Sequence, residues 1–348
     1  MKRIAAAALV GAVLVVVAAV AASYVVYQRV GEPYRGFGGP ERFVDLPPGT
    51  TTAEIGKRLV DAGVVRDSLT FRLALWRTGV ARRLQAGEYR FDRPMSAEAV
   101  LHKIARGEVH LRPITFPEGL TIAEMAAVFE LAGFGKASEF AEAARRAELV
   151  KDLDPRATDL EGYLFPETYR LGRHTSASDL VGMMVARFRQ VLTADLVEES
   201  SAAGFDVREL VTLASLVEKE TGRADERTLV AAVYRNRLRI HMGLQCDPTV
   251  IYALQRAGKW DGNLTREDLS FDSPYNTYRY SGLPPGPIAA PGRDSLIAAA
   301  RPAAVDYLYF VSRNDGSHEF AESLAEHNRN VLRYQIRYFR DKRRGQTR

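Results

Sequence analysis

The stretch VDLPPGTTTAEIGKRLVDAG, residues 44–63, returns at residues 114–133 as ITFPEGLTIAEMAAVFELAG. Both copies contain a Pro-x-Gly turn, then Thr-x-x-Glu, and both end on Ala-Gly. This order is typical of a short strand, a tight turn and a helix that begins with a capping box and ends at glycine. We therefore predict the same strand–turn–helix unit at both places, within an α+β fold.

The segment between the two copies completes a small module. GEYRF at residues 87–91 reads as a strand, and residues 96–106 read as a helix that begins at a serine and ends before Gly107. Residues 109–114 then form the strand that enters the second copy. We predict that residues 42–111 form a separate α+β subdomain, which either binds a ligand or merely positions the rest of the chain.

The N-terminus contains a candidate membrane span. Residues 4–27 carry no charge and follow Lys2 and Arg3, and a helix needs about 20 residues to cross the hydrocarbon core. Small residues near position 20 also suit a cleavable signal peptide, but the apolar run is longer than such signals usually have. We predict an uncleaved single-pass anchor at residues 1–30 with a cytoplasmic N-terminus, then a Gly- and Pro-rich linker at residues 31–41.

The rest of the chain reads as one larger, mostly helical domain at residues 112–342, with a basic tail at 343–348. Residues 265–292 are too rich in Pro and Gly for a long helix, yet they contain three clustered tyrosines. Long loops in compact domains usually serve a function, and tyrosine offers an apolar face and a hydroxyl to a ligand. The loop is either a ligand-binding cleft or a segment that its tyrosines pin to the core.

The composition excludes several classes of site. The 48 Lys and Arg residues nearly balance 43 Asp and Glu residues, too even a balance for a nucleic-acid-binding surface. The single cysteine, Cys246, cannot form an internal disulfide, and no Cys/His spacing fits zinc. We therefore expect no metal, no cofactor and no nucleic-acid partner, and we assign no chemistry to Cys246 and a structural role to His318.

The helix expected at DVRELVTLASLVEKE, residues 206–220, carries a carboxyl group on its apolar side. In projection at about 100° per residue, Glu218 falls inside the apolar arc and Glu220 falls outside it. A buried carboxylate is costly unless it is paired, protonated or facing a cleft, and desolvation favours the protonated form that a general acid needs. Glu218 is thus either an acid/base or the partner of a buried arginine, such as Arg235 or Arg237.

An ordered set of motifs resembles the endolytic murein transglycosylase family, also called YceG-like proteins. The motifs are EGYLFPETY (161–169), LASLVEKET (213–221), VYRNRL (233–238), LQCDPTVIYAL (244–254), SPYNTYRYSGLPPGPIAAPG (273–292), YLYFV (307–311) and HNRNV (327–331). The resemblance implies one N-terminal span in the cell (inner) membrane, an extracytoplasmic LysM-like subdomain at residues 42–111, and a catalytic domain with a loop-rich cleft at 112–342.

The resemblance also implies a lytic cut of the MurNAc–GlcNAc β-1,4 bond within nascent peptidoglycan strands. One glutamate, assigned here to Glu218, protonates the leaving oxygen and then accepts the proton of the C6 hydroxyl, which closes on C1 to leave a 1,6-anhydro end. The candidates for supporting residues are Gln245, Asp247, Tyr275, Asn276, Thr277, Tyr278, Glu161 and Glu167. The implied partners are glycan strands, penicillin-binding proteins and other wall synthases.

Two other functions remain open from the residues alone. One is hydrolysis by two carboxylates, with Glu218 as the acid and Asp247 or Glu161 as its partner. The other is a non-enzymatic wall-binding scaffold, in which Glu218 is only salt-bridged. A reducing sugar end in the product would favour the hydrolase, and no cleavage would favour the scaffold.

Overall fold

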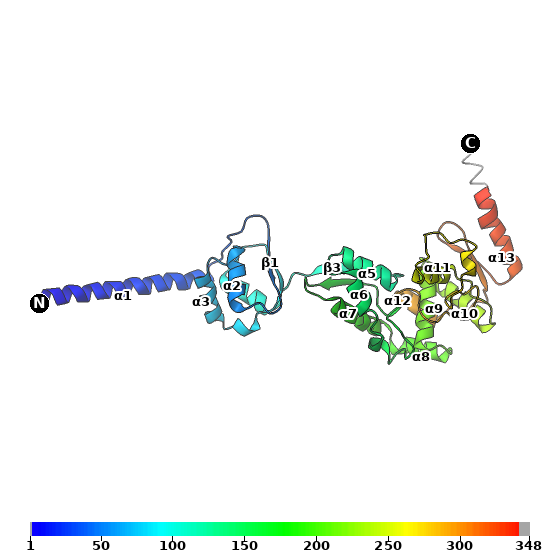
Figure 1. Ribbon diagram of the computed structural model, residues 1–348, viewed down its shortest axis with the longest axis horizontal. Helices are drawn as coiled ribbons and strands as arrows, with labels where there is room; N and C mark the ends of the chain where they lie inside the picture. The colour runs from blue at the N-terminus through cyan, green and yellow to red at the C-terminus, as the bar shows by residue number, and fades with distance from the viewer. Residues whose placement is uncertain (1, 341–348) are drawn as a thin grey trace, which may run out of the picture. The chain divides into compact units, whose positions relative to one another are not determined.

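A computed structural model describes residues 2–340 of the chain, except for the side chains of residues 2–10 and 22. The predicted basic tail at residues 343–348 lies outside the described residues. The fold is a mostly helical α+β arrangement with three two-stranded sheets among the described residues (Figure 1). The chain forms two compact units, residues 1–113 with 170–175 and residues 114–169 with 176–348.

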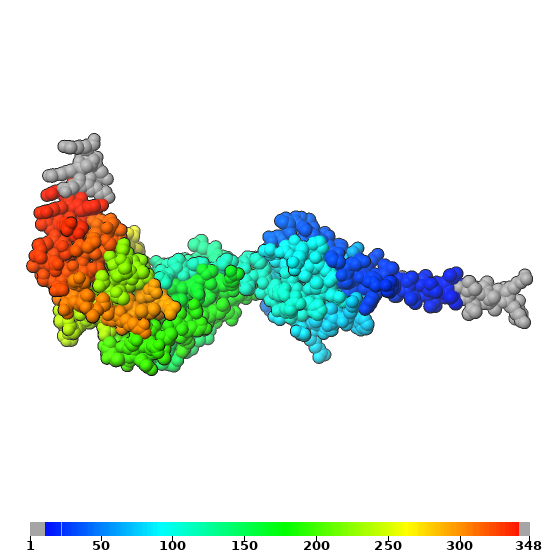
Figure 2. All heavy atoms as spheres, turned by 180° about the vertical axis from the view of Figure 1, so that it is seen from behind, coloured from blue at the N-terminus to red at the C-terminus, as the bar shows by residue number. Residues whose placement is uncertain are grey.

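Helix α1 (Lys2–Gly31) begins unit 1. Its segment Gly11–Gly31 is long and apolar enough to cross a membrane, with a mean hydropathy of 1.9. Figure 2 shows this helix, in dark blue, standing clear of the body of its unit. Its length and composition fit a membrane anchor and a signal sequence alike.

The body of unit 1 packs helices against one antiparallel strand pair. Its elements are β1 (Arg42–Leu46), α2 (Thr52–Asp61), α3 (Ser68–Thr78), η1 (Ala81–Arg83), β2 (Gly87–Phe91) and α4 (Ala97–Ala105). Val44 faces Tyr89 across the pair, and both side chains are buried in the core. Helix α3 was not among the predicted elements, because its apolar residues do not gather on a single face.

Residues 170–175 join unit 1 through ion pairs that the sequence did not indicate. The buried Glu88 carboxylate accepts hydrogen bonds from Arg112 at 2.6 Å and from Arg173 at 2.7 Å. His174 Nε2 lies 2.6 Å from an Asp45 oxygen. A buried carboxylate needs such partners, and here they come from a segment distant in sequence.

Unit 2 is mainly helical. Its elements are α5 (Ile122–Leu131), α6 (Ala137–Ala143), η2 (Ala147–Val150), α7 (Ala177–Val191), α8 (Ala194–Ala202), α9 (Val207–Glu220), α10 (Arg227–Arg239), α11 (Asp247–Arg256), η3 (Asp268–Ser270), α12 (Arg293–Ala300), β5 (Tyr309–Ser312), β6 (His318–Ala321), α13 (Leu324–Val331) and the π-helical turn η4 (Leu332–Arg337). Strand β3 (Arg112–Thr115) pairs with β4 (Thr168–Leu171), where the chain passes between its units.

The repeat forms the predicted strand–turn–helix twice. Gly49 and Gly119 take φ values of 81° and 77° in the two turns, which only glycine adopts easily. Thr121 forms the complete capping box with Glu124 at the start of α5. In α2 the Thr51 side chain accepts the expected bond from the Glu54 backbone, while the Glu54 carboxylate pairs with Arg58 instead.

Helix α9 lies at the centre of unit 2. It begins as predicted at Asp206, whose side chain forms a capping box with Glu209. Every residue from Leu210 to Val217 is buried, because α8, α10, α11 and α12 all pack against this helix. The two glutamates at its C-terminal end therefore have fixed and different surroundings.

Candidate active site

Glu218 lies on the buried side of α9, as its projection predicted, with 7% of its side chain exposed. Its Oε2 accepts a hydrogen bond of 2.9 Å from the backbone N–H of Gly292, the N-cap of α12. Its Oε1 lies 3.5 Å from an Arg227 nitrogen. A helix N-terminus and a guanidinium both stabilise a carboxylate, so these contacts tie α9 to α12 and α10.

Arg227 is shared by three carboxylates. Glu118 and Asp294 lie 3.5 Å from its guanidinium, at the same distance as Glu218. Burial, followed by the nearby Glu218 charge, raises the pKa of Glu118. The sequence analysis named Arg235 and Arg237 as possible salt-bridge partners of Glu218, and both are wrong. The partner is Arg227, the first residue of the same helix, α10.

Glu220 is the last residue of α9 and faces a different group of residues. The Tyr234 hydroxyl donates a 2.6 Å hydrogen bond to its carboxylate. Burial raises the pKa of Glu220; hydrogen bonds from Tyr234 and from the Cys246 thiol oppose this rise, and the Asp247 charge adds to it. The carboxyl group therefore favours the protonated state more than an ordinary glutamate does.

Glu220 lines a pocket of about 260 Å³ that also contains three of the predicted supporting residues. The lining residues are Glu220, Arg237, Leu244, Gln245, Asp247, Tyr278, Phe310 and His327. They come from α9, α10, α11, β5, α13 and the loops around residues 245 and 278. Glu218 is not among them. The glutamate that lines this pocket is thus two residues after the one assigned from the motif.

Two predicted residues shape one wall of this Glu220 pocket. The Tyr278 hydroxyl donates a 2.5 Å hydrogen bond to Asp247, and burial followed by this bond raises the pKa of Tyr278. Gln245 takes a φ of 51°, a strained value for a residue with a side chain. Its backbone N–H donates to Thr277 O at 3.2 Å, which holds this conformation in place.

Asn276 and Thr277 do not line the pocket, but they hold the loop that carries Tyr278 in place by hydrogen bonds. Asn276 is fully buried and donates to the carbonyls of Leu269 and Phe271 at 3.0 and 2.8 Å. The Thr277 hydroxyl accepts the Cys246 backbone N–H at 3.0 Å. Both residues thereby fix the position of Tyr278 and the start of α11.

Tyr275 and Tyr280 make contacts away from Glu220. The Tyr275 ring lies 5.0 Å from the Tyr252 ring, and Arg256 donates to its hydroxyl at 3.4 Å. Tyr280 donates to Asp272 at 2.8 Å and is exposed. Of the three clustered tyrosines, only Tyr278 contacts the Glu220 pocket.

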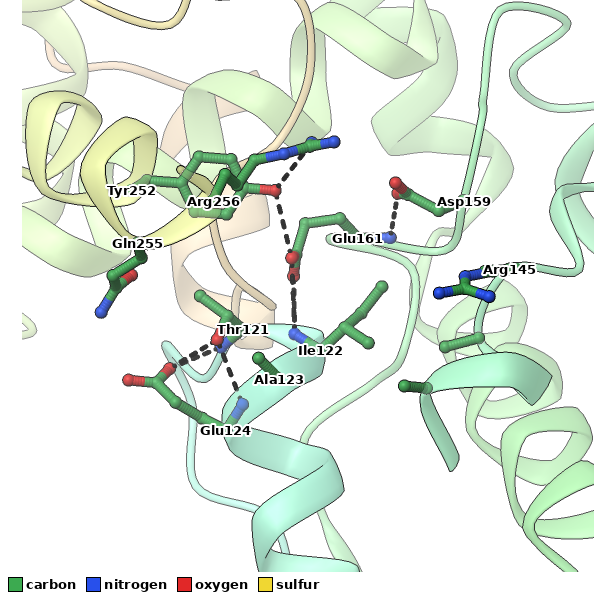
Figure 3. A pocket seen from close by; sticks show the side chains of 12 residues that line it. Thr121, Ile122, Ala123, Glu124, Arg145, Asp159, Glu161, Tyr252, Gln255 and Arg256 are labelled. Atoms are coloured by element: carbon green, nitrogen blue, oxygen red, sulfur yellow. Dashed lines mark hydrogen bonds between the residues drawn. The ribbon is translucent and has the colours of Figure 1, made fainter. Parts of the chain in front are cut away.

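Glu161 lies in a second pocket, of about 360 Å³, between α5, α6 and α11 (Figure 3). Its carboxyl group points toward the backbone N–H of Ile122, which donates at 3.1 Å, and toward the Tyr252 hydroxyl at 3.2 Å. Burial, followed by the charge of Asp159, raises the pKa of Glu161 to about 8. Glu161 and Glu220 therefore occupy separate pockets.

The raised pKa of Glu161 predicts a pH-dependent stability. The folded chain holds this proton up to about pH 8, whereas the unfolded chain releases it near pH 4.5, so the free energy of unfolding falls as pH rises between these values. We expect Glu161→Gln, which keeps the shape without a charge, to remove about 3 kcal/mol of this fall between pH 5 and 8. Denaturant unfolding of both proteins at the two pH values measures it. Equal pH slopes would contradict the prediction.

Glu167 makes a surface ion pair with Arg187, at 2.7 Å, and 42% of its side chain is exposed. It does not line either of the pockets described above. Its place at the end of the EGYLFPETY motif gave no information about which surface it faces.

The sequence analysis assigned no place in the site to three polar residues that line the Glu220 pocket, namely Glu220, Arg237 and His327. Glu220 fell outside the apolar arc of α9, and its hydrogen-bond partners, Tyr234 and Cys246, come from other segments. Arg237 is 8% exposed and donates to the Leu244 carbonyl at 2.7 Å. His327 Nδ1 has no hydrogen-bond partner among residues 2–340. His327 is the first residue of the HNRNV motif, and this motif could have indicated that His327 belongs to the site.

Cys246 and His318 were assigned no chemistry. Cys246 is fully buried beside Glu220. His318 Nδ1 lies 2.7 Å from Glu226, outside the Glu220 pocket.

Comparisons with known proteins agree with the motif order. A family model described as the YceG-like family matches residues 44–333. A relative from Bacillus subtilis (strain 168), named endolytic murein transglycosylase, is 33% identical over 307 residues, covering 84% of each chain. A relative of the same name from Streptococcus pneumoniae serotype 2 is 32% identical, and the match covers 84% of this chain and 58% of that relative.

The fold has a solved counterpart. A crystal structure of a yceG-like protein from Listeria monocytogenes superimposes with a TM-score of 0.57 at 31% sequence identity. It covers 83% of this chain and 98% of its own. Because the family model spans most of the sequence and the relatives are more than 30% identical over most of it, this chain belongs to the YceG-like family.

Proposed function

We propose that this protein is a lytic transglycosylase that cuts the MurNAc–GlcNAc β-1,4 bond within nascent peptidoglycan strands, with Glu220 as its acid and base. The observation that carries the proposal is the half-buried Glu220 carboxyl group, which lines a pocket with Gln245, Asp247 and Tyr278. The family supplies the substrate class, since its relatives are named endolytic murein transglycosylases.

Glu220 suits this role better than Glu218, the residue that the motif first suggested. Both Glu218 oxygens already have partners, Gly292 and Arg227, and Glu218 does not line the Glu220 pocket. Glu220 does line it, and burial raises the pKa of Glu220. General acids that work near neutral pH need a pKa raised in this way.

The reaction needs two successive proton transfers at the Glu220 carboxyl group. Protonated Glu220 donates to the glycosidic oxygen as the bond to MurNAc C1 breaks, and the GlcNAc O4 leaves as a hydroxyl. The Glu220 carboxylate then accepts the proton of the C6 hydroxyl of the same MurNAc, whose oxygen bonds to C1. The product ends in 1,6-anhydro-MurNAc, water is not consumed, and Glu220 is protonated again.

The remaining residues of the pocket position the sugar and the acid. Tyr234 holds the Glu220 carboxyl group from α10. Asp247, oriented by Tyr278, offers its second oxygen to a sugar hydroxyl. His327 of α13 also lines the pocket.

A second function is favoured by one observation, the presence of Asp247 in the same pocket as Glu220. Two carboxylates across a glycosidic bond can hydrolyse it, with one as acid and the other as base or nucleophile. The Tyr278 hydroxyl donates a hydrogen bond of 2.5 Å to Asp247 and so orients its carboxyl group. In the lytic reaction a carboxylate at this position stabilises positive charge developing at C1.

The products distinguish the two reactions. We expect mass spectrometry of digested glycan strands to show internal fragments that end in 1,6-anhydro-MurNAc, 18 mass units lighter than the corresponding reducing ends because no water is added. Fragments with reducing MurNAc ends would show hydrolysis instead and would contradict the lytic proposal.

The setting of the reaction belongs to the same proposal. Helix α1 anchors the chain in the cell membrane with its N-terminus in the cytoplasm, since Lys2 and Arg3 precede the apolar run. The body of unit 1 serves as a LysM-like module on the glycan strand. Cleavage close to the membrane ends strands that penicillin-binding proteins and other synthases extend, which makes these enzymes the expected partners.

A further inference from the structure

Helix α3 of unit 1 is apolar on two sides. Phe71 and Ala74 face the core and are 3% and 0% exposed. On the other side Leu69 and Trp76 are 51% and 76% exposed, and the exposed Arg72 lies between them. The spacing of three and then four residues places these three side chains on one face of the helix. An exposed tryptophan and leucine on one face mark an interaction surface rather than ordinary solvent-facing residues.

The position of α3 identifies what it faces. The Arg77 guanidinium lies 4.5 Å from the centre of the Tyr27 ring on α1, and Arg66, just before α3, lies 3.8 Å from Glu32. The C-terminal turn of α3 is therefore level with Tyr27, while its N-terminal end is level with Glu32, just past α1. Figure 1 shows α3 beside the end of α1, against which it packs.

Tyr27 marks the border of the membrane that α1 crosses. As a helix, the uncharged run of residues 4–27 is about 36 Å long, more than the hydrocarbon core of about 30 Å but less than the 40–45 Å bilayer with its headgroups. Tyr27 therefore lies in the headgroup layer, and Trp76 beside Arg77 lies at the same depth. Tryptophan and tyrosine both favour this layer.

Basic residues continue the α3 surface. Arg82 and Arg83 form most of η1, directly after α3, and both are exposed. Together with Arg72 they give α3 and the turn after it three exposed arginines. Arginines at a bilayer surface attract anionic phospholipid headgroups.

We propose that the face of α3 formed by Leu69, Arg72 and Trp76, with Arg82 and Arg83, is a second membrane contact that lies in the headgroup layer and binds anionic phospholipids. The inference rests on the membrane anchoring by α1 proposed above. A second contact would limit the rotation of unit 1 about the C-terminal end of α1. It would thereby limit the range of distances between the membrane and the rest of the chain.

Trp76 can report its own depth, because the chain contains only one other tryptophan, Trp260. The full-length Trp260→Phe protein is reconstituted into phosphatidylglycerol/phosphatidylcholine vesicles, and only protein that floats with the vesicles is measured. We expect lipids brominated near the top of the acyl chains to lower Trp76 emission about twofold or more, and lipids brominated near the chain ends to lower it less. The matched control is full-length Trp76→Phe, in which Trp260 emission should not change.

A second arm tests the basic residues. In the same vesicles and in the Trp260→Phe protein, Arg82→Glu with Arg83→Glu should reduce the quenching of Trp76. The Trp260→Phe protein with both arginines intact should lose quenching when phosphatidylglycerol is omitted. Trp76 emission that ignores every brominated lipid and is freely quenched by aqueous iodide would overturn the proposal. Failure to float would instead overturn the anchoring by α1, and neither result depends on glycan cleavage.

Discussion

Glu220→Gln is expected to lower the rate of glycan cleavage by about 10²–10⁴-fold, the usual contribution of a general acid. The amide keeps the size of the side chain and its bond to Tyr234, but it has no proton to donate to the leaving oxygen. Release of anhydro-ended fragments from purified strands, measured per folded molecule, gives the rate.

Glu218→Gln is the matched control, since the same isosteric change falls two residues earlier on the same helix. Its contacts are structural, so we expect a lower free energy of unfolding but a cleavage rate close to that of the original protein. The opposite pattern, with Glu218→Gln inactive and Glu220→Gln active, would return the acid to the position that the motif first suggested.

Arg227→Met is expected to destabilise the fold by about 3 kcal/mol, because it leaves the buried Glu218 carboxylate without its counter-charge. The two side chains are 11% and 7% exposed, so water replaces the lost partner poorly. Arg227 does not line the Glu220 pocket, and cleavage per folded molecule should change little. Denaturant unfolding at pH 7 measures the loss.

Arg145→Met provides the control for this prediction. Arg145 pairs with Glu142 at 2.6 Å, yet both side chains are 72% exposed, and such surface pairs contribute about 0–1 kcal/mol. If Arg227→Met were no more destabilising than Arg145→Met, the cluster of Glu118, Glu218 and Asp294 would not depend on its arginine.

The parts of the fold that could be predicted are those specified locally. The repeated turn and capping residues predicted α2 and α5, and Asp206 predicted the start of α9, because each signal lies within a few residues of the element that it controls. Helix α3 was not predicted, because its apolar residues face both the core and the solvent. A single apolar stripe is the signal that sequence patterns detect.

The surroundings of the candidate site could be predicted only in part. Projection of α9 correctly placed Glu218 on the buried side, but it says nothing about which segment covers that side. Glu218 meets the N-terminus of α12, whereas Glu220 meets Tyr234 and Cys246, 14 and 26 residues further along the chain. Only these long-range contacts distinguish a structural carboxylate from one in a pocket.

In the proposed reaction Glu220 accepts the proton of an internal hydroxyl, so that no water enters the product. Digestion of glycan strands in ¹⁸O-labelled water, followed by mass spectrometry, tests this directly. We expect the new MurNAc ends to carry no ¹⁸O, and we expect Glu220→Gln, but not Glu218→Gln, to stop their formation. One ¹⁸O atom in each new end would identify hydrolysis and contradict the proposed reaction.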